Sequence, residues 1–206
     1  MKKERKKMKP NNNTKKYIED LVKKINKTLL SVKDKEIDNF IDAILNAKNV
    51  FIYGVGRSGL VAKSFATRLS HLNINVYMIG DTINRPVEKT DLFIAISGSG
   101  NTKSVVVACN TAKKIGCEIS IITANKESKL YEIADNSILI NTKTKDDDKL
   151  REYITNQLIG NEEIISPMGT IFEISCFVLL DAIIEDLILL TKNTEQSMKQ
   201  RHANIE

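Results

Sequence analysis

Hydrophobic residues recur at helical spacing over several long stretches of the chain. The first stretch, residues 14–48, reads as one long helix or two shorter ones, with Ile18, Val22 and Ile25 on one face. The same spacing predicts helices at Ser58–Leu72, Lys103–Ile115 and Thr170–Leu190, and shorter ones at Lys129–Ala134 and Lys149–Ile159. The last long helix is apolar on almost all sides, so it is predicted to lie in a core or at a subunit interface.

Short apolar runs bounded by turn residues predict five strands between these helices. They are Asn49–Tyr53, Asn75–Ile79, Asp91–Ile96, Glu118–Thr123 and Ser137–Ile140. Most consecutive strands are separated by a helix, which indicates crossover connections and a parallel sheet covered by helices on both faces. The fold class is therefore α/β, and 206 residues suffice for one domain with a full core.

The turn Ser97–Thr102 has the composition of an anion cradle. It follows a buried strand, precedes a helix, and consists of Ser97, Gly98, Ser99, Gly100, Asn101 and Thr102. Its glycines allow close approach of the backbone, and its hydroxyls and the first N–H groups of the helix donate hydrogen bonds. A cap for the following helix, at Thr102 or Asn101, explains only part of this composition. We expect a phosphate group here.

A second glycine turn, Gly54–Gly59, follows the first strand and matches the dinucleotide pattern G-x-G-x-x-G. Asp81 lies where a ribose-binding acid would be expected, so a dinucleotide remains an alternative ligand. Arg57 and Ser58 put polar side chains inside the turn, which favours a sugar phosphate bound by Gly56, Arg57 and Ser58. A purely structural role for the three glycines is the third alternative.

Glu173 and two histidines are the candidate proton-transfer groups. Thr170–Glu173 has the T-x-x-E form of a capping box, so capping is the better interpretation from local chemistry, with catalysis as its competitor. His71 ends a predicted helix, where it would complement the helix dipole or project toward the site of another subunit. His202 lies near the chain end, and the two histidines are too far apart in sequence to indicate a metal site.

The charge of the chain is concentrated in its first residues. The whole chain has a net charge of +5, but residues 1–16 hold eight basic residues and one acid. We interpret residues 1–13 as a disordered basic arm, and the rest has no basic excess to indicate nucleic-acid binding. The three cysteines form no metal or disulfide motif, no secretory signal is visible, and the apolar helix contains four acids. A cytoplasmic protein without membrane or metal is expected.

Four stretches together resemble the SIS (sugar isomerase) domain family. They are Tyr53–Gly59, Ile96–Thr102, Ser166–Glu173 and Arg201–Glu206. The last two are similar to the branch of that family formed by the 6-phospho-3-hexuloisomerases, and the resemblance covers roughly residues 18–206. It implies that residues 14–206 form a single SIS domain following the basic arm.

The resemblance implies a homotetramer that interconverts D-arabino-hex-3-ulose 6-phosphate and fructose 6-phosphate through a cis-enediol, without a cofactor. This reaction completes formaldehyde fixation in the ribulose monophosphate pathway. Glu173 matches the family's presumed base, and our candidate for the second proton-transfer group is His71, followed by His202. Another phosphosugar isomerase, acting for example on arabinose 5-phosphate, and a non-catalytic phosphosugar sensor remain alternatives.

Overall fold

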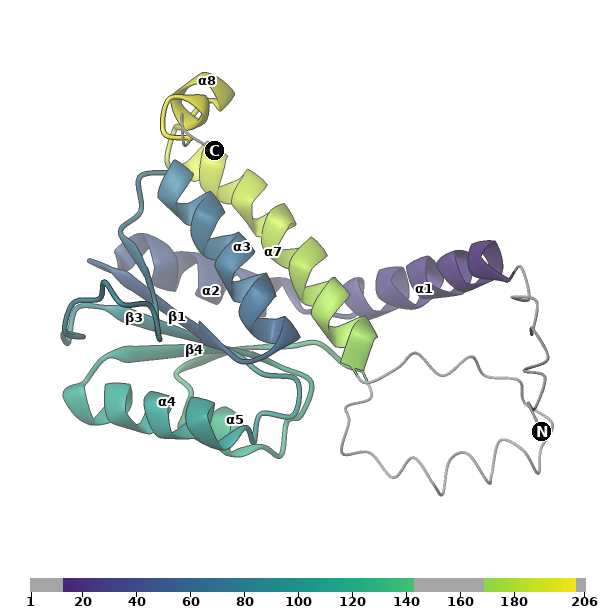
Figure 1. The fold of residues 1–206 in the computed structure, drawn as a ribbon, viewed down its shortest axis with the longest axis horizontal. Coiled ribbons are helices and arrows are strands. Elements are labelled where there is room, and N and C mark those ends of the chain that lie inside the picture. The colour runs from purple at the N-terminus through teal and green to yellow at the C-terminus, as the bar shows by residue number, and fades with distance from the viewer. Residues whose placement is uncertain (1–12, 143–168, 203–206) are drawn as a thin grey trace, which may run out of the picture.

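Five parallel strands form the central layer of the computed structural model, which describes residues 13–142 and 169–202 (Figure 1). The strands are β1 (Val50–Gly54), β2 (Val76–Met78), β3 (Leu92–Ile96), β4 (Glu118–Thr123) and β5 (Asn136–Leu139). Their order across the sheet is β2-β1-β3-β4-β5, and every neighbouring pair is parallel. The predicted α/β class and five-stranded parallel sheet are confirmed.

Helices cover both faces of this sheet. One layer contains α2 (Asp34–Asn46), α3 (Arg57–His71) and α7 (Thr170–Leu190), with α3 and α7 side by side in Figure 1. The other layer contains α4 (Lys103–Ile115) and α5 (Lys129–Ile133). Helix α1 (Thr14–Leu29) contacts α7 and then projects away from the sheet, and α8 (Glu195–Lys199) lies near the end of α3.

The central strands are buried on both faces because each strand contributes to two hydrophobic cores. In β3, Leu92, Ile94 and Ile96 face the α2, α3 and α7 layer, whereas Phe93 and Ala95 face α4 and α5. This alternation explains why the strand reads as a continuous apolar run in the sequence. The two-sided burial fixes the register of β1 against β3, where Gly54 is paired with Ile96.

A network of polar side chains lies at the amino-terminal edge of the sheet, where the strands begin. Asn49 Nδ2 donates to Asp91 Oδ1 at 2.6 Å, and the other Asp91 oxygen accepts from the Glu88 N–H at 2.7 Å. Arg85 donates to Asn49 Oδ1 and to Glu88 Oε1. These bonds fasten the connection between β2 and β3 far from the edge where the glycine turns lie.

Several expectations can be compared with the structure directly. The helical stretch 14–48 is two helices, because the chain turns between Leu30 and Lys33. Helix α8 was not expected, and the helix predicted at Lys149–Ile159 lies outside the described residues, as do twelve residues of the basic arm. No helix within 13–142 and 169–202 is long and apolar enough to cross a membrane.

Candidate active site

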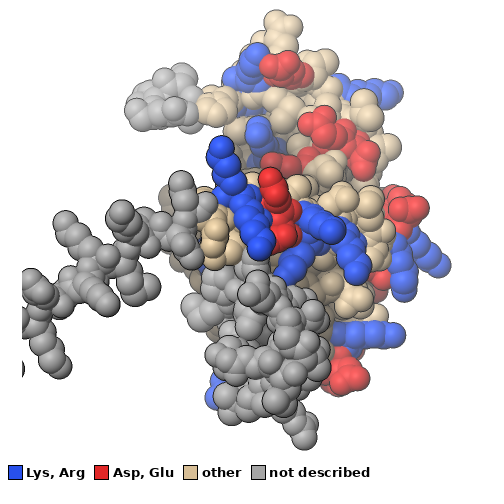
Figure 2. Space-filling model, turned by 90° about the vertical axis from the view of Figure 1, so that its right-hand side faces the viewer, with Lys and Arg blue, Asp and Glu red and all other residues tan. Residues whose placement is uncertain are grey.

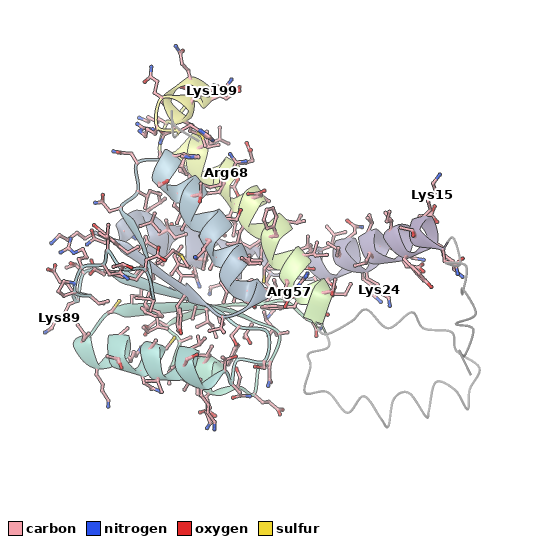
Figure 3. All side chains as sticks on the ribbon, viewed as in Figure 1. Lys15, Lys24, Arg57, Arg68, Lys89 and Lys199 are labelled. Atoms are coloured by element: carbon pink, nitrogen blue, oxygen red, sulfur yellow. The ribbon has the colours of Figure 1, made fainter. Side chains whose placement is uncertain are left out.

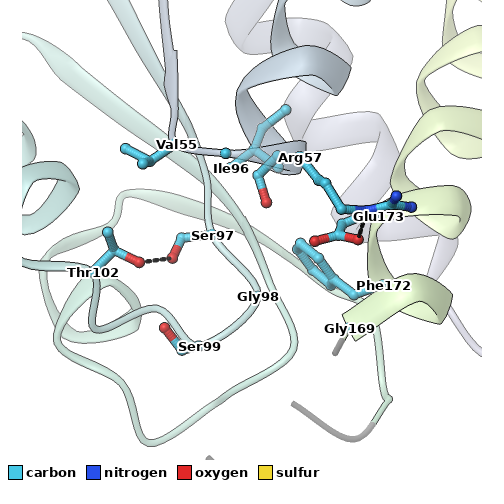
Figure 4. Close-up of a pocket in the computed structure, with 12 residues that line it drawn as sticks. Val55, Arg57, Ile96, Ser97, Gly98, Ser99, Thr102, Gly169, Phe172 and Glu173 are labelled. Carbon is cyan, nitrogen blue, oxygen red and sulfur yellow. Dashed lines mark hydrogen bonds and ion pairs between the residues drawn. The ribbon is translucent and has the colours of Figure 1, made fainter. Parts of the chain in front are cut away.

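The two glycine turns meet at the carboxyl edge of the sheet, where the strand order reverses. β1 pairs with β2 on one side and with β3 on the other, so the connections after β1 and β3 diverge and leave a crevice between them. Such switch points are the usual ligand-binding positions of open parallel sheets. A pocket opens here, and it is lined by residues from both turns and from the start of α7 (Figure 4).

The turn after β3 presents hydroxyl groups to this pocket. Ser97, Gly98, Ser99 and Thr102 all line it, and Ser97 Oγ lies 3.1 Å from Thr102 Oγ1. Thr102 is the N-cap of α4, as predicted, but its side chain makes no capping hydrogen bond to the helix. The first N–H groups of α4 and these hydroxyls are therefore oriented for an anionic ligand.

Two predicted binding residues of the same turn lie outside the pocket lining. Gly100 has a φ of +63°, and a Cβ at this position would lie 2.1 Å from Ser128 Oγ. Asn101 Oδ1 accepts the N–H of Lys129 at 3.1 Å. Both residues dock the turn on the start of α5, so the structure gives them a supporting position beside the pocket.

The turn after β1 brings a second helix N-terminus to the pocket. Gly56, Arg57 and Ser58 line the pocket together with Val55. The last glycine of the pattern, Gly59, allows α3 to pack directly on its strand, because a Cβ there would lie 2.8 Å from the Gly54 carbonyl oxygen. The starts of α3, α4 and α7 all line this pocket, and the N-cap residue of each helix makes no side-chain capping bond.

Glu173 faces the pocket from the first turn of α7. Its side chain is buried, and Oε2 accepts a hydrogen bond from Arg57 Nε, which forms an ion pair between the starts of α7 and α3. The N-cap of α7 is Gly169, with a φ of +87°, so Thr170 is already the first helical residue and does not occupy the N-cap position. The capping box expected from Thr170 and Glu173 is thus wrong, because tertiary packing directs the carboxylate to Arg57 and the pocket.

Figure 4 shows how the charged and hydroxylic groups are divided. Ser97, Ser99 and Thr102 lie on one side of the pocket, and Glu173 with Arg57 lies on the other. The ring of Phe172 lies beside Glu173, and a Cβ at Gly98 would approach it to 3.1 Å. An anion held by the hydroxyls would therefore have the rest of its molecule directed toward a carboxylate.

His71 lies at the opposite end of α3 from Arg57. A helix of 15 residues separates the two ends by about 21 Å, so His71 does not reach the pocket of its own chain. Its ring is buried and lies 5.2 Å from the ring of His202, and its carbonyl accepts from Arg201 Nη1 at 2.9 Å. The two histidines are neighbours in space, remote from Glu173 within one chain.

The described residues include neither a reactive thiol nor a metal-binding cluster beside the pocket groups. Cys109, Cys117 and Cys176 are buried free thiols, and burial raises the pKa of Cys109 and Cys117 to about 12. No cluster of three His, Cys, Asp or Glu side chains suited to a metal occurs in the parts of the chain that the structure describes. Among the described residues that line the pocket, Glu173 is the only acid.

Four pocket residues were not predicted: Val55, Ile96, Gly169 and Phe172. Three of them adjoin predicted residues, namely Val55 beside Gly56, Ile96 beside Ser97 and Phe172 beside Glu173. They have no polar or ionisable side chain, so a sequence analysis that selects reactive or hydrogen-bonding groups does not identify them. The sequence feature that could have identified them is their position inside the stretches that resemble the SIS domain family, namely Tyr53–Gly59, Ile96–Thr102 and Ser166–Glu173.

Comparisons with known proteins agree with this geometry. The SIS domain family model matches residues 43–159. The 3-hexulose-6-phosphate isomerase of Bacillus subtilis is 33% identical over 94% of this chain and 99% of its own length. The protein of the same name from Methanocaldococcus jannaschii is 35% identical, over 82% of this chain and 84% of its own.

A solved structure supports the same relationship. The crystal structure of a Methanococcus jannaschii protein, from which a 3-hexulose-6-phosphate isomerase function was inferred, matches with a TM-score of 0.76 at 32% identity. The match covers 93% of this chain and 99% of the other. The chain belongs to the SIS domain family, and its named relatives over most of its length are isomerases. The predicted family is confirmed.

Gly100→Ala is expected to distort the turn Ser97–Thr102. The new Cβ would overlap Ser128, so the turn must shift, at a cost of about 1–3 kcal/mol in the free energy of unfolding. Gly80→Ala is the matched control, because Gly80 also has a positive φ but has open space around its Cβ position. Urea denaturation and phosphate binding by calorimetry measure both variants; equal behaviour of the two would contradict the supporting role of Gly100.

Protonation of His71 is expected to lower the free energy of unfolding at acidic pH. Burial first, then the positive charges of His202 and Arg68, lower the pKa of His71 below its ordinary value of 6.5. As the pH falls, the unfolded chain therefore takes up this proton before the folded chain does. The contribution of His71 to the free energy of unfolding is fully present above the unfolded pKa, and it is lost as the pH falls through 6.5 toward the folded pKa. Urea unfolding at a series of pH values should show a shallower pH dependence in His71→Asn than in wild type. Identical slopes would contradict this assignment.

Proposed function

We propose that the protein interconverts D-arabino-hex-3-ulose 6-phosphate and fructose 6-phosphate. The observation that carries the proposal is that Glu173 and the hydroxyl-lined turn Ser97–Thr102 border one pocket, although α4, β4, α5 and β5 separate them in the chain. A phosphosugar spans these two groups, with its phosphate on the hydroxyls and its carbon chain beside the carboxylate. The names of the relatives support the particular sugar.

The proposed phosphate site consists of Ser97, Ser99 and Thr102 with the first turn of α4. Binding energy from the phosphate, which does not react, fixes the reacting carbons beside the base. The uncapped N-terminus of α3 adds further positive potential at the same edge. This arrangement supports a substrate with a dianionic end and an uncharged reacting end.

Glu173 is the proposed base. It removes the proton from C2 of the 3-ketose, and the electrons of the C–H bond form a cis-enediol between C2 and C3. Returning the proton to C3 gives fructose 6-phosphate, with the O2 proton lost and the O3 proton gained. The transfer between the oxygens requires a second group, and His71, or next His202, is proposed for it from a neighbouring subunit, because both lie away from this pocket.

Arg57 is proposed to orient the base and to stabilise enediolate charge. Its Nε holds one carboxylate oxygen, Oε2, while Oε1 has no protein hydrogen-bond partner among the described residues. The second oxygen is thus available to the substrate. The Arg57 side chain is 58% exposed, so its contribution lies in orientation rather than in the strength of a screened ion pair.

We propose that the protein works as a homotetramer in the cytoplasm, as the resemblance implies. The exposed apolar residues of α7 support association of the chains. The reaction belongs to formaldehyde fixation in the ribulose monophosphate pathway.

Glu173→Gln tests the proposed reaction. The variant keeps the shape of the base but does not accept the carbon-bound proton, so turnover of the 3-ketose phosphate should fall by at least about 10²-fold. Binding of fructose 6-phosphate, measured by calorimetry, should change little because the phosphate contacts remain. Glu127→Gln is the control, since this exposed acid lies at the same edge of the sheet outside the pocket. Full activity of Glu173→Gln would eliminate the proposed base.

A further inference from the structure

The turn Ser97–Thr102 rests on a segment of chain that does not itself reach the pocket. This supporting segment, residues 123–130, runs from the end of β4 into α5, and none of these described residues lines the pocket. Four consecutive residues of the turn nevertheless make hydrogen bonds to it, namely Gly98, Ser99, Gly100 and Asn101. Any effect of the supporting segment on a ligand must therefore pass through the turn.

The carbonyl oxygens of the turn are directed at the supporting segment. The carbonyl of Gly98 accepts from the Ala124 N–H at 3.0 Å, that of Ser99 from Asn125 Nδ2 at 3.3 Å, and that of Gly100 from the Leu130 N–H at 3.1 Å. A carbonyl oxygen that faced the pocket instead would repel the oxygens of a phosphate group. These bonds thus leave the hydroxyl groups, and not the three carbonyls, as the polar groups that the turn presents to a ligand.

The pocket depends on this arrangement because it contains little positive charge. Among the described residues that line it, Arg57 is the only basic one, and its Nε is bonded to Glu173. Figure 3 shows Arg57 at the start of α3, with Arg68 and Lys89 far from it. Figure 2 looks onto the side from which α1 projects and shows basic side chains gathered near its centre, but none of the five lysines of α1 lines the pocket. Affinity for a phosphate must therefore depend on where the hydrogen-bond donors of the turn and of the start of α4 are held.

Thr123 lies at the centre of the supporting bonds. Its side chain is fully buried at the end of β4, and Oγ1 donates to the Gly98 carbonyl at 3.3 Å and accepts the Asn125 N–H at 3.2 Å. A Cβ at Gly100 would lie 2.9 Å from the same oxygen. One hydroxyl therefore contacts the turn and also fixes the backbone of Asn125, whose side chain holds the Ser99 carbonyl.

Gly98 links this support to the hydroxyls of the site. It stands between Ser97 and Ser99, which both line the pocket, and its carbonyl is the group that Thr123 holds. On its other side it packs closely against the ring of Phe172 at the start of α7 (Figure 4). The position of Gly98 therefore sets both serine hydroxyls relative to α7.

We propose that Thr123 is a positioning residue of the phosphate site. It does not contact the ligand. Its hydroxyl holds Gly98 and Asn125 so that the donors of the turn converge on one anion. The inference rests on the proposed function, because it requires a phosphate group at this turn. It assigns to that function a residue that lies outside the pocket and outside the stretches that resemble the SIS domain family.

The alternative is that Thr123 only stabilises the fold, as any buried side chain of β4 does. Ser120 provides a comparison, because its hydroxyl is buried on the same strand and has no hydrogen-bond partner among the described residues. Removing that hydroxyl changes the interior of β4 without changing any bond to the turn. Substitutions at Ser120 and Thr123 therefore distinguish a structural role from a positioning role.

Binding of fructose 6-phosphate and of inorganic phosphate to the full chain, measured by calorimetry, tests the role of Thr123. Thr123→Val keeps the shape of the side chain and removes both hydrogen bonds of Oγ1, so each ligand should bind about tenfold more weakly. The factor should be the same for both ligands, because they share only the phosphate group. Thr123→Ser keeps the hydroxyl and should bind both ligands as wild type does.

Two control variants separate positioning from general destabilisation. Ser120→Ala removes an unbonded hydroxyl from β4, and Ile138→Val shortens a buried side chain of the neighbouring strand β5. Both should bind the two ligands as wild type does, at a temperature at which circular dichroism shows every variant to be folded. Asn125→Ala is the second test variant. It removes the side chain that holds the Ser99 carbonyl, and it should also weaken the binding of both ligands.

The possible outcomes separate this inference from the function on which it rests. Wild type that binds neither ligand would overturn the phosphate site, and the proposed function with it. Wild type that binds both, with Thr123→Val folded and binding equally well, would overturn the positioning role alone. A loss that Thr123→Ser does not reverse, or that Ser120→Ala or Ile138→Val shares, would also overturn it. If Thr123→Val does not fold, unchanged binding by Asn125→Ala has the same meaning.

Discussion

The parallel pairing of β1 and β3 at the centre of the sheet is the constraint on which the site depends. Both strands are buried on two sides, and their register sets Gly54 beside Ile96. The two turns that follow therefore begin at the same level of the sheet. Because the chain leaves β1 and β3 in different directions, the turns separate and the N-termini of α3 and α4 border a single crevice. The rest of the pocket is built on these two helix ends.

The start of α7 completes the crevice with a group of opposite character. Uncapped helix ends and hydroxyls attract an anion, whereas Glu173 repels one. Arg57 orients the buried carboxylate of Glu173 at the pocket, and their contact joins the start of α7 to the start of α3. A ligand with a phosphate at one end and neutral hydroxyl and carbonyl groups at the other satisfies both requirements. This division supports an isomerase substrate more directly than the fold alone does.

Local pattern was sufficient for most of the fold. The buried strands and long helices were predictable because their apolar residues recur with a clear period. The turn Ser97–Thr102 was recognisable as a candidate binding turn from its small and hydroxylic residues. The contact of Glu173 with Arg57 was not, since the two residues are 116 positions apart and a local capping rule suggested another role. The pairing of His71 with His202, held by Arg201, likewise depends on tertiary packing that no local pattern encodes.

The position of His71 at the far end of its helix follows from the predicted helix bounds, and it limits what this residue can do within one chain. The sequence places it on the helix that begins at the binding turn, but helix length carries it about 21 Å from that turn. Likewise, the exposed side of α7 reads in the sequence as part of an apolar helix, and only the structure shows which residues the layer of α3 and α2 leaves uncovered. Helix packing, rather than residue type, decides which residues of α7 are exposed.

Proton exchange on the sugar tests the central claim that this pocket moves a proton between two carbons of a phosphosugar. Fructose 6-phosphate is incubated with the protein in deuterated water, and the C3–H signal is followed by NMR. The account predicts that this signal is lost as deuterium enters C3, together with the appearance of the 3-ketose phosphate. Tight binding of fructose 6-phosphate without loss of the C3–H signal would contradict the account and indicate a phosphosugar-binding protein that does not catalyse the reaction.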